Sequence, residues 1–340
     1  MRLLPTSERM GNVTETVLIL GANGRFGRVA VRAFADAGWN VIAQARKPLV
    51  DACGQGVSYL GIPPTEQDAV VAAAKGASIV VNAMNPLYTR WDAEALPLHA
   101  SAIAIARSLG ATLMFPGNVY NYGSPIPPEI SEETPQHPTN RKGEIRCAME
   151  AAMRTDGLRS IVVRAGDFFG GPGEGSWMDQ AIVKKLPKGE ITYPGPRDLQ
   201  HSWAYLPDLA QTFVLLAQAR GGLPQHSNLH FPGHTLTGNE LVQGITAAAM
   251  RNGLLAANAG PSIKGIPWTL LRVAGVFNPM LRELARMSYL WLQPHRLRGD
   301  KLAQIIGPIP HTSLDAALDS TLAELKLTGK QHEDAPAGPA

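Results

Sequence analysis

The feature that most constrains this chain is a glycine pattern directly after its first expected strand. The short apolar run 16–20 predicts that strand, and Gly21-Ala-Asn-Gly24-Arg-Phe-Gly27 follows it. Glycines at this spacing permit a tight turn, close approach of the backbone to a pyrophosphate, and close packing of the next helix on the strand. The amides at the start of that helix then face the phosphates, where the helix dipole favours an anion. The pattern therefore predicts a dinucleotide site that includes Gly21, Asn23, Gly24, Arg25, Phe26 and Gly27.

Apolar strands alternate with helical patterns over the first 160 residues, which is typical of βαβ units around a parallel sheet. Six strands are expected, at 16–20, 40–45, 57–60, 78–82, 112–115 and 160–164. Helices are expected at 25–37, 66–75, 93–109 and 143–155. The predicted fold class is α/β, a Rossmann doubly wound parallel sheet with a smaller C-terminal lobe that faces the substrate.

The end of the second strand indicates which dinucleotide is bound. A protein that binds NAD usually has Asp or Glu there, about 20 residues beyond the glycines, to hold the ribose 2′-hydroxyl. This chain has Gln44-Ala-Arg46-Lys47 instead, with no carboxylate to repel a 2′-phosphate and two cations to pair with it. Arg25 can close over the same phosphate, so NADP(H) is favoured over NAD(H). The alternative is that Arg46 and Lys47 are solvated residues at a strand end.

Asn82-Ala83-Met84 follows the fourth strand, where a chain of this fold passes beside the cofactor's ribose and nicotinamide. We assign these residues to the cofactor site, and Arg164 with them. Asn82 can equally be a turn residue without a ligand contact.

Beyond Gly170 the elements shorten, and helices are expected at 206–219, 238–252 and 313–325. We predict a flexible extension over 1–14, the NADP-binding Rossmann domain over 15–170, and a disordered tail over 329–340. Residues 171–328 are expected to form mainly the substrate lobe, with segments that return to the first domain. Charges interrupt the apolar stretch 266–292, which therefore predicts an amphipathic helix and loop that either packs on the protein, covers a pocket or forms a dimer surface.

Composition excludes other classes of function. The 340-residue chain has a formal charge of only +3 and no basic cluster of the kind that binds nucleic acid. Cys53 and Cys147 are far apart without metal-ligand spacing, so we expect no metal site and a reducing, cytoplasmic location. The polar N-terminus lacks the apolar core of a secretory signal. The expected partner is a small-molecule substrate, and no association with a membrane is expected. A homodimer is an alternative to a monomer.

Four stretches, 21–27, 164–172, 203–210 and 229–233, resemble the extended short-chain dehydrogenase/reductase superfamily, the NAD(P)-dependent epimerase/dehydratase-like group. Its members usually carry Tyr-x-x-x-Lys on the helix before the sixth strand, where the tyrosine exchanges a proton with the substrate oxygen. Here Lys142 stands at the tyrosine position and Arg146 at the lysine position. The usual serine or threonine after the fifth strand is missing as well.

The resemblance implies that the chemistry is reassigned to other residues. Lys142 is the leading acid/base candidate, since isoflavone-reductase-like enzymes are similar in using a lysine and since burial and neighbouring cations lower an ammonium pKa. Arg146 is expected to hold ribose hydroxyls or to stabilise negative charge. Tyr120 or Tyr122 can supply the missing phenol, and Asn118 can orient a substrate carbonyl. Lys142 and Arg146 can also be a solvated pair on a helix surface.

Three further side chains have two interpretations each. His201 can reach a pocket, although a lone histidine is more often structural. Tyr88 and Trp91 are either walls of an apolar pocket or ordinary core residues.

Three functions remain as hypotheses. The leading one is an NADP(H)-dependent oxidoreductase that acts on a small organic carbonyl or hydroxyl compound. The second is a nucleotide-sugar epimerase or dehydratase, which the missing tyrosine disfavours. The third is a non-catalytic NADP(H) sensor similar to the NmrA-like regulators, which the loss of both catalytic positions favours.

Overall fold

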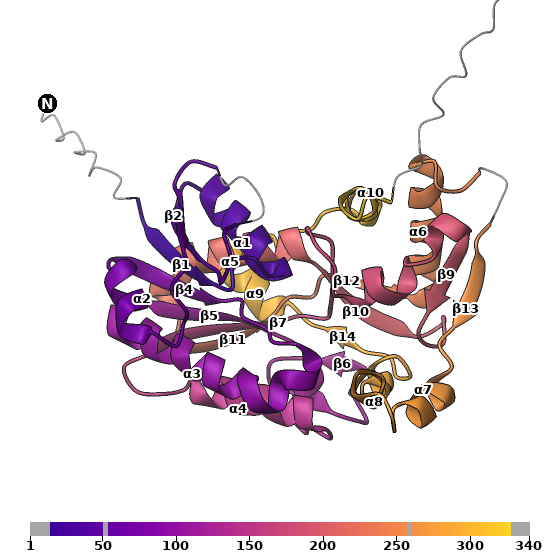
Figure 1. The fold of residues 1–340 in the computed structure, drawn as a ribbon, viewed down its shortest axis with the longest axis horizontal. Coiled ribbons are helices and arrows are strands. Elements are labelled where there is room, and N and C mark those ends of the chain that lie inside the picture. Colours follow the sequence, from indigo (N-terminus) through magenta and orange to yellow (C-terminus); the bar gives the residue numbers. More distant parts are fainter. Residues whose placement is uncertain (1–13, 50–53, 257–259, 328–340) are drawn as a thin grey trace, which may run out of the picture.

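The computed structural model describes residues 14–49, 54–256 and 260–327. At its centre is a seven-stranded sheet in which every neighbouring pair is parallel (Figure 1). Chain order reverses between β1 and β4, which makes their carboxyl ends the switch point where such sheets bind ligands. The predicted Rossmann fold class is confirmed. The order across the sheet is β11 (His226–His230), β7 (Arg159–Arg164), β5 (Thr112–Gly117), β4 (Ala77–Asn82), β1 (Thr16–Leu20), β2 (Asn40–Gln44) and β3 (Val57–Leu60).

The expectation of six strands is one short, because β11 adds a seventh at the edge of the sheet. It pairs with β7 from His226 opposite Ser160 to His230 opposite Arg164. The strand begins with three polar residues and is only partly buried there. It therefore lacks the apolar run that marked the other strands in the sequence.

Helices cover both faces of the sheet, so its central strands are apolar throughout. One face carries α1 (Arg25–Asp36), α5 (Leu206–Ala219) and α9 (Asp300–Ile306), and the other carries α2 (Gln67–Ala73), α3 (Trp91–Leu109) and α4 (Arg141–Ala152). In the first layer Phe26 of α1 meets Phe213 of α5 edge to face at 4.8 Å between ring centroids. The elements α5, α9 and β11 all come from beyond residue 171 and return to this sheet.

A second, smaller lobe lies beside the carboxyl ends of the strands (Figure 1). It has its own apolar core, and within the described ranges no helix is both long and apolar enough to cross a bilayer. As expected, the stretch 266–292 forms helices with an intervening loop. The lobe and its connections contain β6 (Glu129–Ile130), β8 (Asp167–Phe169), β9 (Glu190–Tyr193), β10 (Gln200–Tyr205), β12 (His234–Thr237), β13 (Ser262–Gly265), β14 (Arg296–Leu297), α6 (Gly238–Arg251), α7 (Trp268–Ala274), α8 (Pro279–Arg286) and α10 (Leu314–Glu324).

Candidate active site

The glycine turn forms a cradle of backbone amides at the start of α1. Gly21 has a φ of +82°, and a Cβ added to Gly27 would lie 2.2 Å from the carbonyl oxygen of Gly21. Both positions therefore require glycine. The N-cap of α1 is Gly24, which offers no side-chain hydrogen bond, and the first turn holds no acidic residue. These uncapped amides fit the pyrophosphate of a dinucleotide.

Two amide side chains hold this turn against the end of β2. Gln44 is buried, and its Oε1 accepts a hydrogen bond of 3.2 Å from the amide of Gly21. The Nδ2 of Asn23 donates to the carbonyl oxygen of Lys47 at 2.9 Å. Arg46 and Lys47 are exposed beside the turn. In the sequence Gln44 stands where a carboxylate is missing, and in the structure its side chain fixes the turn.

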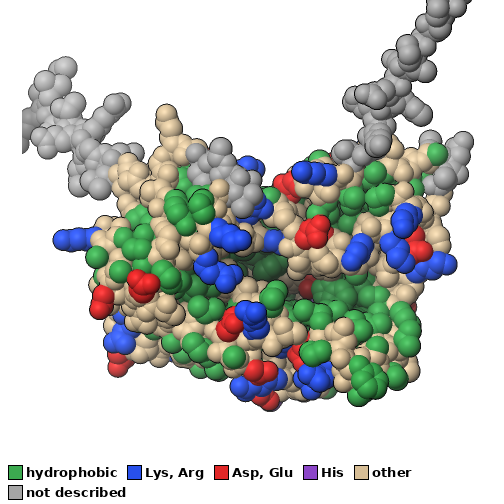
Figure 2. Space-filling model, viewed as in Figure 1, with side chains coloured by type: hydrophobic (Ala, Val, Ile, Leu, Met, Phe, Trp, Pro, Cys, Tyr) green, Lys and Arg blue, Asp and Glu red, His purple; other side chains and the backbone are tan. Residues whose placement is uncertain are grey.

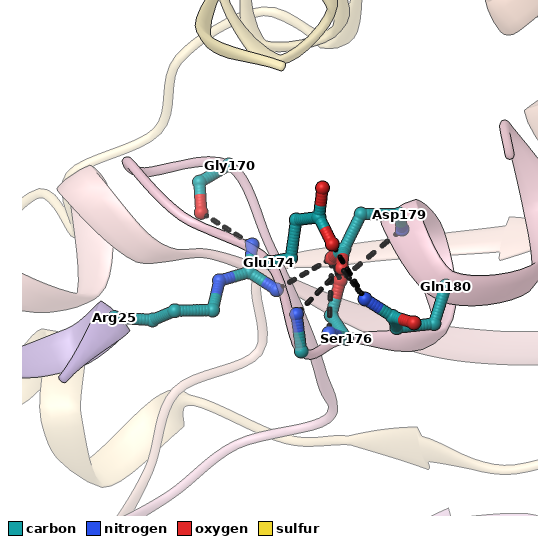
Figure 3. Close-up of polar contacts among 7 residues, drawn as sticks. Arg25, Gly170, Glu174, Ser176, Asp179 and Gln180 are labelled. Atoms are coloured by element: carbon teal, nitrogen blue, oxygen red, sulfur yellow. Dashed lines mark hydrogen bonds and ion pairs between the residues drawn. The ribbon is translucent and has the colours of Figure 1, made fainter.

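Arg25 occupies a position that differs from the expected one. Its Nη1 pairs with Asp179 at 2.7 Å, and its Nη2 donates to the carbonyl oxygen of Gly170 at 2.8 Å (Figure 3). The Asp179 side chain is almost fully buried and also accepts a hydrogen bond from the amide of Ser176. We call this arrangement the Arg25–Asp179 clasp. It joins the glycine turn to the segment that enters the second lobe, so Arg25 has partners other than a 2′-phosphate.

The other residues assigned to the cofactor divide into two groups. Ala83 and Met84 lie against the glycine turn, because a Cβ on Gly21 would be 3.0 Å from the amide nitrogen of Met84. Asn82 is buried, and its side chain meets the Nδ1 of His99 at 3.0 Å and accepts from the amide of Met84, so it shapes the turn. Burial lowers the pKa of His99 to about 4.

Arg164 is a correction to the predicted cofactor set, because its side chain is fully buried within the core. Its guanidinium pairs with Glu150 at 2.5 Å and donates to the hydroxyl of Tyr122 at 2.6 Å. Tyr122 in turn meets His230 at 3.0 Å. Arg164 and Tyr122 therefore belong to an internal polar network, and burial raises the pKa of Tyr122 to about 12.

Lys142 is buried, so the solvated helix surface considered above is wrong for this residue. Its Nζ forms an ion pair with Glu283 of α8 at 2.9 Å and donates to the carbonyl oxygen of Tyr88 at 2.8 Å. The ammonium also lies 4.6 Å from the centroid of the Tyr88 ring. The first turn of α4, capped by the Asn140 side chain, holds Lys142 in this place.

Two phenols adjoin Lys142, and Tyr120 is the one of the two candidate tyrosines that the structure brings there. Its hydroxyl is hydrogen-bonded to the hydroxyl of Tyr88, from the short helix η1 (Tyr88–Arg90). Burial raises the pKa of Tyr88 to about 12 and that of Tyr120 well above its ordinary value. Both phenols therefore stay protonated at neutral pH and can donate hydrogen bonds. Asn118 accepts from the amide of Tyr120 at 3.0 Å, which fixes the loop that carries it.

Arg146 lies one turn further along α4 and is also buried. Its guanidinium stands 4.8 Å from the Trp91 ring and 5.1 Å from the Phe115 ring, and its Nη1 reaches the carbonyl oxygen of Pro116 at 3.3 Å. Within the described part of the chain, its Nε has no hydrogen-bond partner. A buried donor of this kind normally meets a ligand or water oxygen.

His201, in β10, belongs to a second polar pair. Its Nε2 lies 2.7 Å from the carboxylate of Asp167 in β8, and its ring stacks on Trp291 at 4.3 Å between centroids. Asp167 is not among the predicted site residues, although it lies in 164–172, one of the stretches that carry the family resemblance. After burial, the charge of Asp167 contributes to the raised pKa of Tyr88 and Tyr120, which places it near the phenol pair.

The surface is hollowed between the two lobes, and hydrophobic side chains line the floor of this cleft (Figure 2). Helix α8 packs against η1, where Glu283 reaches Lys142. The stretch 266–292 therefore packs on the rest of the protein, which is the first of the three interpretations given for it. Among the described residues, no cluster of three His, Cys, Asp or Glu side chains could hold a metal ion.

A family model confirms the resemblance on which the site assignments draw. The model of the NAD dependent epimerase/dehydratase family matches residues 17–229, well over half of the chain. The chain belongs to this family. It is accordingly an enzyme of a nicotinamide-dinucleotide-dependent class, which does not favour the non-catalytic regulator hypothesis. No curated protein matches the sequence.

Solved structures with the same fold share little sequence with this family member. The Bordetella bronchiseptica enzyme WbmH, in complex with NAD+, has 16% identity and a TM-score of 0.70 over 92% of this chain and 98% of its own. UDP-glucose 4-epimerase from Thermotoga maritima has 14% identity and a TM-score of 0.70 over 92% and 99%. The NDP-hexosamine 5,6-dehydratase TunA has 18% identity and a TM-score of 0.67 over 93% and 99%. At identities of 14–18%, the similarity shows a shared fold and does not identify the substrate of this chain.

Proposed function

We propose that this protein is an NADP(H)-dependent oxidoreductase that acts on a small organic carbonyl or hydroxyl compound. The observation that carries the proposal is the group formed by the buried side chains of Lys142, Tyr120 and Arg146 with the half-buried Tyr88. It supplies protonated donors at the place where the family normally has tyrosine and lysine. A cytoplasmic location agrees with the half-buried free thiol of Cys147, while Cys53 lies outside the described residues.

The side chains near Lys142 can supply the proton for the substrate oxygen and stabilise the negative charge that develops on it. The bound nicotinamide would supply or accept the hydride. In the reductive direction, the Tyr88–Tyr120 pair would donate the proton that the substrate oxygen gains. Lys142, whose position Glu283 and the Tyr88 carbonyl fix, stabilises the negative charge that develops on the oxygen. We assign the unpaired Nε of Arg146 to a ribose hydroxyl, because a buried donor of this kind normally meets a ligand or water oxygen.

The preference for the phosphorylated cofactor rests on Arg46 and Lys47 at the carboxyl end of β2. Both are exposed there, and no carboxylate occupies positions 44–47. Two solved structures of the same fold, MoeE5 and WbmH, hold NAD. They are only 15% and 16% identical to this chain, so their similarity shows the fold and does not indicate which dinucleotide this chain prefers.

Calorimetry with the two oxidised dinucleotides tests the cofactor proposal. We expect NADP+ to bind more tightly than NAD+, and Arg46→Ala to weaken NADP+ binding by about tenfold while leaving NAD+ unchanged, because one guanidinium–phosphate contact is lost. Lys75→Ala, an exposed cation at the end of α2, is the matched control. Tighter binding of NAD+ to the unaltered protein contradicts the proposal.

The second candidate is a nucleotide-sugar epimerase or dehydratase, which the solved structures of similar fold favour. Such an enzyme regenerates its cofactor within each cycle. A purified protein that retains its dinucleotide and oxidises no added NADPH with any carbonyl compound would support this candidate over the first.

A further inference from the structure

We propose that the hairpin formed by α7 and α8 docks on the surface of an anionic phospholipid bilayer. Hydrophobic side chains gather over these two helices, at the lower right of Figure 2. Phe277, in the turn between the helices, is 88% exposed and its neighbour Val276 is 70% exposed. An exposed apolar group of this kind marks an interaction site. We call its members the apolar tip, which consists of Leu270, Val273, Val276, Phe277 and Met280.

Contacts with the rest of the protein hold the hairpin in a fixed place. Trp268 at the start of α7 is buried in the core of the second lobe. Glu283 of α8 pairs with the buried Lys142 at 2.9 Å. A Cβ added to Gly275 would lie 2.8 Å from the Cα of Arg282, so the two helices approach closely at the turn. The apolar tip is therefore presented to solvent by a packed element.

The backbone of the turn can enter an apolar medium at low cost. The amide of Val276 donates to the carbonyl oxygen of Val273 at 3.1 Å, and the amide of Phe277 donates to that of Ala274 at 3.1 Å. The side chain of Asn278 caps the first turn of α8. Because lipid offers no hydrogen bonds to the backbone, donors that enter it must be bonded within the protein. The amides of the turn meet this requirement.

The charges around the apolar tip favour an anionic surface. Arg272, Arg282 and Arg286 are exposed on the same two helices. Glu283 is the only carboxylate between residues 260 and 299, and its side chain is only 14% exposed. It pairs with Lys142 and Arg286, so the exposed face of the hairpin carries a surplus of positive charge. Cations beside exposed apolar residues gain from anionic head groups while the apolar residues enter the acyl boundary.

A second copy of the chain suits this surface less well. A two-fold contact through the hairpin would bring Arg272 and Arg282 of the two copies together, and like charges repel. A stable interface also uses about 20–30 residues on each side, whereas the apolar tip has five. The expectation of no membrane association rested on the charges that interrupt 266–292, which disfavour a spanning helix but allow a peripheral contact.

Co-sedimentation of the full-length protein with vesicles tests the docking, without cofactor and independently of any turnover. We expect the protein to bind vesicles that mix phosphatidylglycerol with phosphatidylcholine, and to bind phosphatidylcholine alone about tenfold more weakly. Val276→Ser combined with Phe277→Ser should weaken binding about tenfold or more, because the inserted apolar groups are lost. Tyr59→Ser, at an exposed aromatic residue of β3, is the control. No binding of the unaltered protein, or full binding by the double variant, overturns the proposal.

A charge variant tests the choice of an anionic surface. Arg272→Gln combined with Arg282→Gln should bind the phosphatidylglycerol vesicles about tenfold more weakly and leave the weak binding to phosphatidylcholine unchanged. Arg107→Gln combined with Arg154→Gln makes the same net charge change at exposed positions elsewhere and is the control. Equal losses in the two double variants would show that only the net charge of the protein matters, which contradicts docking by the hairpin.

Fluorescence locates the contact and covers the case in which a serine variant does not fold. Vesicles that contain brominated lipid should quench Phe277→Trp more strongly than the unaltered protein, whereas Tyr59→Trp should show no added quenching. The absence of added quenching in Phe277→Trp overturns the proposal. A concentration-dependent dimer in analytical ultracentrifugation that Val276→Ser with Phe277→Ser dissociates would assign the apolar tip to a second copy, and this result also overturns the proposal.

Discussion

At Lys142, three contacts offset the cost of burying an ammonium group. The Glu283 carboxylate, the Tyr88 carbonyl oxygen and the Tyr88 ring all lie close to Nζ. Each replaces part of the hydration that burial removes. These contacts hold the ammonium group next to the phenol pair, whereas a lysine on a solvated helix face would have little influence on a bound substrate.

We expect Lys142→Met to lower both activity and stability, for different reasons. The activity falls because the charge beside the reacting oxygen is lost. The stability falls because Glu283 loses its buried partner and keeps only the exposed Arg286, so we expect a cost below the roughly 3–5 kcal/mol of a fully broken buried pair. Adding Glu283→Leu should restore the thermal transition without restoring NADPH oxidation. Recovery of turnover in this double variant would show that Lys142 has no chemical role. Arg141→Ala, an exposed neighbour on α4, is the control.

His99 predicts an acid limit to stability. Burial lowers its pKa to about 4, so between about pH 6.5 and pH 4 the unfolded chain binds a proton that the folded protein excludes. The stabilisation is present above pH 6.5 and is lost as the pH falls, by about 3 kcal/mol in all. Denaturant titrations across this range should show a shallower decline for His99→Gln than for the exposed control His137→Gln. Equal declines would contradict the assignment.

Individual site residues could be predicted from the sequence only where a local motif carried them. The glycines, Arg46 and Lys142 stand at defined positions of a motif or strand end. Glu283 does not, since its contact with Lys142 joins residues about 140 positions apart, and no local pattern marks it. Arg25 and Arg164 were misassigned because their acidic partners, Asp179 and Glu150, are determined by the tertiary structure.

At the scale of elements, the junction of β1 and α1 is the most tightly constrained. The helix approaches the turn so closely that any side chain at Gly27 meets backbone, which cannot move away locally. The same principle applies where α4 meets the loop of Tyr120, because a Cβ on Gly143 would lie 2.5 Å from the carbonyl oxygen of Tyr120. These two contacts place the cofactor cradle and Lys142 relative to the sheet.

We expect Gly27→Ala to separate α1 from the turn and so to weaken NADP+ binding by about tenfold or more. The overpacked contact should also reduce the free energy of unfolding by about 1–3 kcal/mol. Gly221→Ala serves as the control, since a Cβ there would meet nothing within 4 Å. Calorimetry measures the change in NADP+ binding, and thermal melts measure the change in stability. Unchanged NADP+ affinity in Gly27→Ala would contradict the assignment of the glycine turn to the cofactor site.

Helices and central strands could be predicted because their burial on the sheet imposes an apolar period on the sequence. Thus the predicted helix 25–37 corresponds to α1 at 25–36, and 206–219 coincides with α5. The polar start of β11 carries no such period. The short strands β8, β10 and β12 pair across long separations in sequence, so their arrangement depends on contacts that no local window contains.

At the scale of the whole molecule, the two lobes are joined by buried polar contacts as well as by the chain. The Arg25–Asp179 clasp connects the cofactor cradle to the segment entering the second lobe, and the pair Lys142–Glu283 connects α4 to α8. Both ion pairs are largely buried, so breaking either one leaves a buried charge without that partner.

We expect Asp179→Asn to accelerate the release of NADP(H) by about tenfold, because the variant removes the ionic part of the contact that holds the glycine turn. Stopped-flow displacement of NADPH fluorescence measures this rate. Glu190→Gln, whose partner Lys185 is exposed, is the control. An unchanged release rate in Asp179→Asn would show that the clasp does not restrain the cofactor.

The clasp also has a consequence for kinetics. Because the clasp ties the glycine turn to the segment that enters the second lobe, we expect it to make departure of the cofactor slower than departure of the product. Steady-state data should then follow a compulsory sequence, with the dinucleotide first on and last off. Product inhibition by the oxidised dinucleotide would be competitive against NADPH and noncompetitive against the carbonyl compound.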